Sequence, residues 1–331
     1  TLIFYGATSF NQDLNSWDVS SVSNMSYMFS RTSMNQDLSS WDVSQVTSMN
    51  SMFSQTPFNG NISTWNVSNV TDMSTMFSQT SFNQDLSSWD VSAVTSMKEM
   101  FRDSSFNTNI SSWNVSAVTN MFGMFRDSSF NQDISSWNLS SVANMSEMFR
   151  KSLFNQDLNS WNVGSVTNMS GMFRESSFNQ SINSWNVARV SDLSKMFLEA
   201  SSFNQALNSW DVSSATNMSQ MFYGASSFNQ DLSSWEVSRV TNMFQMFYEA
   251  SSFNQDISAW DVSKVVTMSG MFRDSPFNGD LSDWEVGRVT NMSNMFSETQ
   301  MFNQDIGRWN TSSVIYMSEM FDCAESFNQD I

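Results

Sequence analysis

Thirteen tryptophans recur along the chain at intervals of 24 or 25 residues, from Trp17 to Trp309. A Phe-Asn pair precedes nearly every tryptophan and Met-Phe follows it, as Phe82-Asn83 and Met100-Phe101 illustrate around Trp89. A constant period of this length is typical of a solenoid, whose coils cannot bury an apolar face alone and must stack on their neighbours. The sequence therefore predicts a single solenoid domain of about thirteen repeats over residues 1–331. Both ends fall inside a repeat, so we expect a segment of a longer array.

Within one repeat, the apolar pattern predicts a short strand followed by a short helical turn. Apolar and polar residues alternate across Trp89-Asp90-Val91, which is the period of a half-buried strand. From Val94 the apolar residues recur every third position, at Met97 and Met100, which favours a short α or 3-10 turn. The predicted fold class is therefore a leucine-rich-repeat-like solenoid with one short parallel β-strand and one helical turn in each coil.

Two ladders of side chains are expected to hold neighbouring coils together. The indole of each tryptophan should be buried, with its N–H donating to a backbone carbonyl. The position after this phenylalanine is asparagine in every repeat, and its side-chain amide can hydrogen-bond to backbone groups of an adjacent coil. The predicted ladder residues include Asn83, Asn107, Asn131, Trp89, Trp113 and Trp137. The many Met and Phe residues are interpreted as core and not as a cofactor pocket.

Composition narrows the range of functions. The net charge of −18 argues against nucleic acid and anionic membranes as partners. Histidine is missing and Cys323 is the single cysteine, which removes the commonest general base and any disulfide framework. No apolar run is long enough for a membrane span. We therefore expect neither an enzyme nor membrane insertion within this segment, and no cofactor.

An outward row of acidic or amide residues lies between each tryptophan and the following valine. Its charged members form the candidate binding row of the strand face: Asp18, Asp42, Asp90, Asp211, Glu236, Asp261 and Glu285. A second row includes Asp85 and Asp133. The carboxylates of the two rows either stay solvated, with their repulsion screened by salt, or bind Ca²⁺ through their oxygens. The sequence leaves both possibilities open.

Departures from the repeat consensus suggest places for association. Phe122 and Phe244 replace a serine and could present aromatic rings on the helical side. A partial basic row follows Met-Phe and could join one solenoid to the acidic face of another, or could form solvated salt bridges. Its members are Arg102, Arg126, Arg150, Arg174 and Arg273.

The repeat also resembles a known family. Residues 227–247, Ser-Phe-Asn-Gln-Asp-Leu-Ser-Ser-Trp-Glu-Val-Ser-Arg-Val-Thr-Asn-Met followed by Met246-Phe247, are similar to the BspA-like leucine-rich-repeat surface proteins. They resemble in particular the variant known as a domain of unknown function in mycoplasma surface lipoproteins. The resemblance covers nearly the whole chain and implies a secreted or surface-anchored protein of the adhesion type.

Three functions follow from these observations. The first is an extracellular structural or adhesive solenoid that forms a surface coat, spacer or filament through repeat-mediated interactions. The second is a module that binds glycan or protein through the strand face, and the third is a calcium-stabilised acidic solenoid. The expected partners are a second copy, or a protein or glycan of a host or cell surface.

Overall fold

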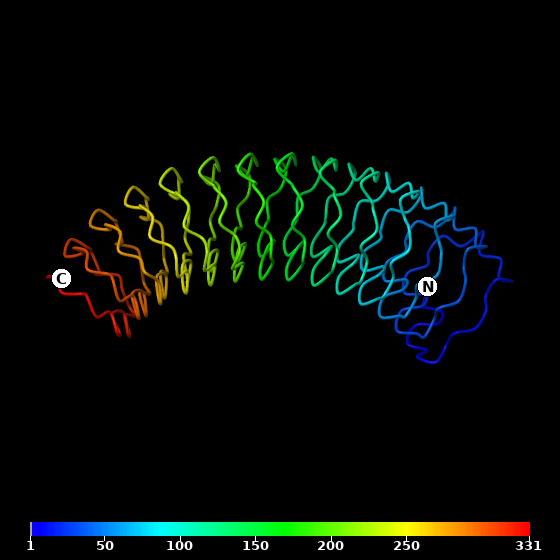
Figure 1. The fold of residues 1–331 in the computed structure, drawn as a ribbon, viewed down its shortest axis with the longest axis horizontal. Helices are drawn as coiled ribbons and strands as arrows, with labels where there is room; N and C mark the ends of the chain where they lie inside the picture. The colour runs from blue at the N-terminus through cyan, green and yellow to red at the C-terminus, as the bar shows by residue number, and fades with distance from the viewer. Residues whose placement is uncertain (1) are drawn as a thin grey trace. The chain divides into compact units, whose positions relative to one another are not determined.

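The computed structural model describes residues 2–331 and divides the chain into two compact units, Thr1–Ser165 and Val166–Ile331. In each unit the chain runs through successive coils that lie side by side (Figure 1). The coils repeat at the tryptophan period, so the predicted repeat solenoid is confirmed within each unit. A single domain over residues 1–331 stays a prediction.

Regular backbone pairing between coils is confined to isolated parallel bridges. Among residues 2–331 there is neither a helix nor a strand longer than one bridge residue. In the N-terminal unit the bridges are Asn24–Ser48, Ser48–Asp72, Asp72–Ser96, Ser96–Asn120 and Asn120–Asn144. In the C-terminal unit they are Asn168–Asp192, Asp192–Asn217, Asn217–Asn242, Asn242–Thr267, Thr267–Asn291 and Asn291–Tyr316. The predictions of a strand at residues 89–91 and of a helical turn after Val94 were therefore wrong.

Local turns enclose the predicted strand on both sides and leave no room for strand pairing. The Trp89 amide donates to the Leu86 carbonyl (3.1 Å), and the Val94 amide donates to the Val91 carbonyl (2.9 Å). Burial still alternates, since Trp89 and Val91 are buried and Asp90 is exposed. The alternation of apolar and polar residues thus indicates which side chains are buried, but it does not indicate a hydrogen-bonded strand.

The segment after each bridge joins neighbouring coils through every second amide. Each donor bonds to the carbonyl of the residue that precedes its own equivalent in the next coil. The pairs are Met97 to Asn120 (3.0 Å), Glu99 to Phe122 (2.7 Å), Phe101 to Met124 (3.0 Å) and Asp103 to Arg126 (2.9 Å). Two of the amides between them bond within the coil, Met100 to Met97 (3.2 Å) and Arg102 to Glu99 (3.2 Å). Coil stacking therefore satisfies backbone groups as well as burying side chains.

This pattern requires left-handed backbone at fixed positions. Glu99 and Asp103 both have a φ of 51°, and each is the third residue of a four-residue turn, where a positive φ is characteristic of type II geometry. An α-helix excludes such residues, which is why the spacing of three does not produce one. Glycine stands at the first of these positions in other coils, as at Gly123 (φ 57°) and Gly171 (φ 61°).

The core consists of stacked aromatic and methionine side chains. Phe101 lies 5.7 Å from Phe77 and 5.8 Å from Phe125, measured between ring centroids, and all three are fully buried. Within its own coil Phe101 stacks on Phe106 at 4.0 Å. Pairs of this kind contribute about 0.5–1.5 kcal/mol beyond the area they bury.

Tryptophan and asparagine side chains provide further bonds between coils. Nε1 of Trp113 donates to the carbonyl oxygen of Leu86 (2.9 Å), which lies one coil back. Equivalent bonds hold Trp89 and Trp137 to Ile62 and Ile110. The asparagines form a chain of bonds in which Oδ1 of one accepts the backbone N–H of the next. Asn83 accepts from Asn107 (2.8 Å), and Asn107 accepts from Asn131 (2.9 Å).

Replacing Trp113 with phenylalanine should remove the indole donor and leave the buried Leu86 carbonyl without it. We expect a loss of about 1–3 kcal/mol in the free energy of unfolding, measured by urea denaturation. Trp17→Phe is the control, because the Trp17 ring is 43% exposed. Equal losses in the two variants would show that the indole bond does not stabilise the coil stack.

Candidate interaction surfaces

The predicted binding row lies on the surface with each charged side chain exposed. This holds for all of its members: Asp18, Asp42, Asp90, Asp211, Glu236, Asp261 and Glu285. The aspartates among them are held by a local turn, in which Oδ1 accepts the backbone N–H of the residue two further on. The Ser92 amide lies 3.0 Å from Oδ1 of Asp90, and the Ser263 amide lies 3.0 Å from Oδ1 of Asp261. The aspartates of the row therefore present fixed carboxylates.

These turns also keep the aspartates ionised. The Ser92 hydroxyl, and then the Ser92 backbone N–H, lower the pKa of Asp90. Ser44 lowers the pKa of Asp42 in the same way, against a smaller opposing effect of Asp18 in the neighbouring coil. In the second row the order is reversed, since the Ser87 backbone N–H is the first cause of the lowered pKa of Asp85. Neighbouring carboxylates repel each other less than their serines stabilise them.

The calcium hypothesis is not decided by this geometry. Within residues 2–331 there is no group of three or more His, Cys, Asp or Glu side chains that could hold a metal ion. Calcium also accepts hydroxyl and backbone carbonyl oxygens. Calcium binding therefore stays a prediction.

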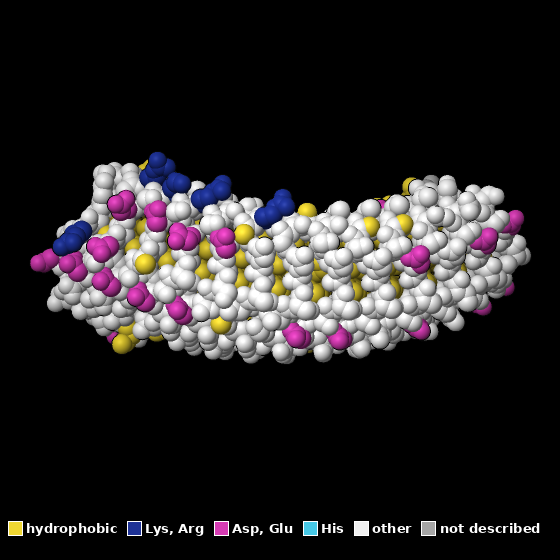
Figure 2. Space-filling view, turned by 90° about the horizontal axis from the view of Figure 1, so that it is seen from above, with side chains coloured by type: hydrophobic (Ala, Val, Ile, Leu, Met, Phe, Trp, Pro, Cys, Tyr) yellow, Lys and Arg dark blue, Asp and Glu magenta, His cyan; other side chains and the backbone are white. Residues whose placement is uncertain are grey.

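The C-terminal unit carries a row of cations that the acidic pattern alone did not reveal. Arg189, Arg239, Lys264 and Arg288 occupy one repeat position, three residues after the acidic row, and all four are exposed. Figure 2 shows a line of Lys and Arg side chains beside a line of Asp and Glu side chains. The signal in the sequence is the constant offset of Arg239 from Glu236, Lys264 from Asp261 and Arg288 from Glu285.

Shallow hollows open beside the acidic row of this unit. One of about 230 Å³ is lined by Trp210, Asp211, Ser234 and Glu236 among others. A second of about 360 Å³ is lined by Trp284, Glu285, Gly287 and Arg308 among others. Carboxylates at the edge of both hollows favour cationic groups.

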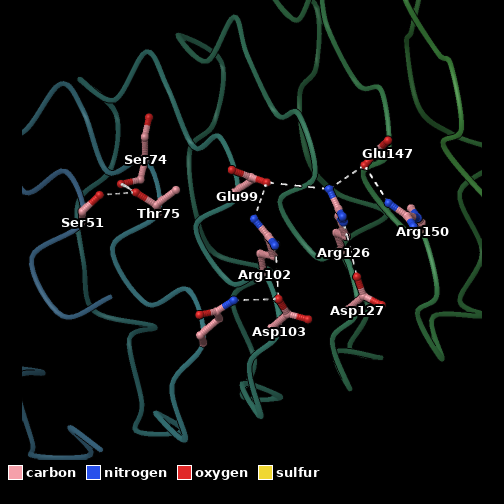
Figure 3. A network of polar contacts seen from close by, with 11 residues as sticks. Ser51, Ser74, Thr75, Glu99, Arg102, Asp103, Arg126, Asp127, Glu147 and Arg150 are labelled. Atoms are coloured by element: carbon pink, nitrogen blue, oxygen red, sulfur yellow. Dashed lines mark hydrogen bonds and ion pairs between the residues drawn. The ribbon is translucent and has the colours of Figure 1, made fainter. Parts of the chain in front are cut away.

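The predicted basic row after Met-Phe is engaged within its own unit. Arg126 bonds to Glu147 of the next coil (2.8 Å) and to Asp127 (3.3 Å), and it lies 3.9 Å from Glu99 of the preceding coil (Figure 3). Arg102 pairs with Glu99 (3.1 Å). The remaining pairs are Arg150 with Glu147 (3.4 Å), Arg174 with Glu175 (2.9 Å) and Arg273 with Glu298 (2.8 Å). Arg126 and Arg273 join neighbouring coils through these pairs, whereas the pairs of Arg102, Arg150 and Arg174 lie within their own coils.

The two substituted phenylalanines differ in exposure. Phe122 is half-buried, with Nζ of Lys98 5.5 Å from its ring centroid, in a cation–π arrangement. Phe244 is 36% exposed. Their role in association stays a prediction.

Comparison with known proteins identifies the repeat. The family described as "Mycoplasma protein of unknown function, DUF285" matches residues 1–81, 32–129, 55–153, 78–182, 175–276 and 255–331, which together span the chain. The chain belongs to the DUF285 family. No curated protein matches this DUF285 chain. Among its described residues, no helix has the length and hydropathy needed to cross a membrane.

Two leucine-rich-repeat structures are among the solved structures that match the DUF285 chain. A toll-like receptor, in the "Crystal structure of TLR13-ssRNA13 complex", is 9% identical with a TM-score of 0.24. This match covers 97% of the DUF285 chain and 54% of the receptor, so the chain spans about half the receptor's length. The Leptospira interrogans LRR protein LIC12759 is 8% identical with a TM-score of 0.23, over 87% of this chain and 73% of that one.

Replacing Ser92 with alanine should raise the pKa of Asp90 toward its ordinary value of 3.8, because the largest cause of the lowering is removed. Ser87→Ala should raise the pKa of Asp85 less, because the Ser87 hydroxyl that it removes is a smaller cause of the lowering than the backbone N–H that it keeps. Carboxyl-detected NMR titration measures both. A lowered pKa stabilises the fold above the unfolded value, and this stabilisation is lost as pH falls through the folded pKa. Equal shifts at both sites would contradict the assignment of causes.

Proposed function

We propose that this DUF285 chain is an extracellular or cell-surface structural protein of the adhesive type. Its coils serve as a coat, spacer or filament segment, and it associates through surfaces that recur from coil to coil. It needs no catalytic centre and no cofactor.

The observation that carries this proposal is the repeated, fixed row of exposed charge. Asp42 and Asp90 in one unit, and Asp211 and Asp261 in the other, are held by the same turn to the serine two residues on. Such a row presents the same group from many coils without converging on one point. A display of this kind suits contacts with an extended or repeating partner.

The same uniformity argues against an enzyme that uses two carboxylates. Acid and base catalysis by such a pair needs environments that drive the two pKa values apart. Here Asp18, Asp42, Asp90, Asp211 and Asp261 share one cause of a lowered pKa, the hydroxyl and amide of the following serine. Side chains that ionise alike are suited to display and not to proton transfer.

Glycan or protein binding by the acidic face is the second candidate. The hollow beside Trp210, Asp211 and Glu236 favours it, because a ring edge with carboxylates at its rim can hold a small polar or cationic group. The resemblance of the repeat to BspA-like surface proteins supports the extracellular or cell-surface location in this proposal.

Light scattering and negative-stain electron microscopy of the full chain, over a range of concentrations, test the proposal. We expect elongated particles that associate as concentration rises. A monodisperse, rounded monomer at every concentration would contradict a structural role. A glycan-array signal from such a monomer, lost in Asp211→Asn/Glu236→Gln/Asp261→Asn, would support the second candidate instead.

A further inference from the structure

We propose that the C-terminal unit binds a second copy of this chain through two adjacent rows of opposite charge. The acidic row is Glu236, Asp261 and Glu285, and the basic row is Arg239, Lys264 and Arg288. This inference rests on the proposed structural function and specifies its partner.

The first argument is that these cations form no close ion pair among the described residues; Lys264 acts on Asp261 only as the smallest cause of its lowered pKa. Arg239, Lys264 and Arg288 are exposed, and none of the three lies within 4.0 Å of a carboxylate in the part of the chain that the structure describes. Arg126, by contrast, reaches carboxylates of both neighbouring coils. One set of cationic side chains thus pairs with carboxylates of the same chain, and a second set is directed to solvent.

The second argument concerns the acidic partners. The row position is aspartate in most charged coils, but Glu236 and Glu285 are one methylene longer. Asp261 is held by the Ser263 amide at 3.0 Å, whereas neither glutamate accepts a hydrogen bond from the residue two further on in the described contacts. Their carboxylates can therefore extend outward to a partner.

The third argument is self-complementarity. In each of these coils the cation follows the carboxylate by three residues, so the acidic and basic rows run side by side along the coils. Two molecules of the chain therefore present rows with the same spacing. A two-fold axis parallel to the rows places the acidic row of one copy opposite the basic row of the other. Glu236 then faces the partner's Arg239, Asp261 faces the partner's Lys264, and Glu285 faces the partner's Arg288. The symmetry doubles these three contacts, so six pairs form together.

The surroundings of the rows suit such an interface. Val266 is 44% exposed at a position that is threonine in the adjacent coils, at Thr241 and Thr290, and it lies two residues from Lys264. It supplies an apolar group beside the charges. The hollows beside Glu236 and Glu285 offer space for the partner's longer cationic side chains. An interface of this kind should weaken as salt increases.

Charge reversal in the full chain tests the pairing by sedimentation equilibrium. One variant, Arg239→Glu/Lys264→Glu/Arg288→Glu, has two acidic rows, and the other, Glu236→Arg/Asp261→Lys/Glu285→Arg, has two basic rows. We expect the dimer Kd to rise at least about a hundredfold in each, because like charges then face each other. Mixing the two variants should restore a dimer, and the variant carrying all six changes should dimerise with itself.

Lys151→Glu/Lys195→Glu is the control, because it shifts the net charge in the same direction as the first variant, at exposed positions outside the rows. It should leave the Kd nearly unchanged. If the wild-type chain associates but the row variants and their mixture behave like the control, this interface is wrong and the structural function stands. If the wild-type chain never associates, both are wrong. Row variants that lose binding to heparin without any change in the dimer would assign the basic row to an anionic polysaccharide and overturn the proposal.

Discussion

The hydrogen bonds between coils in the segment 97–103 and its equivalents are the constraint on which the rest of the structure depends. Every second amide of this segment bonds to the next coil, and the left-handed residues, such as Glu99 and Asp103, make that alternation sterically compatible with tight turns. A left-handed non-glycine residue costs about 1–2 kcal/mol. The inter-coil bonds and the buried Phe and Met side chains offset this cost, so a coil is stable only against a neighbour.

The tryptophan period was enough to predict a solenoid, and the alternation around Trp89 correctly indicated which side chains are buried. The local backbone could not be obtained in the same way. Apolar residues every third position, as at Val94, Met97 and Met100, fit a helical turn and a series of reversing turns equally well. Glycine at Gly123, Gly171 and Gly270, where other coils have polar residues, was the available signal for a positive φ.

The candidate surfaces were predicted in part. The acidic row is exposed where the pattern placed it, because it alternates with buried Trp and Val. Which arginines are free could not be predicted, because pairing depends on the distance between coils. Arg126 reaches Glu147 only because their coils are neighbours, whereas Arg239 has the same charge and no carboxylate within 4.0 Å among residues 2–331. A repeat that displays some charges and pairs others can therefore stabilise its own stack and still present a surface to a second molecule.

Site-resolved hydrogen exchange on residues 89–103 tests the coil-to-coil hydrogen bonds most directly. The structure predicts slow exchange at the amides of Met97, Glu99, Phe101 and Asp103, and fast exchange at Lys98, Asp90 and Val91, whose amides donate no hydrogen bond in the described contacts. Slow exchange at Lys98 would indicate a helical turn, and slow exchange centred on Asp90 and Val91 would indicate a strand. Either result would contradict the account of how these coils stack.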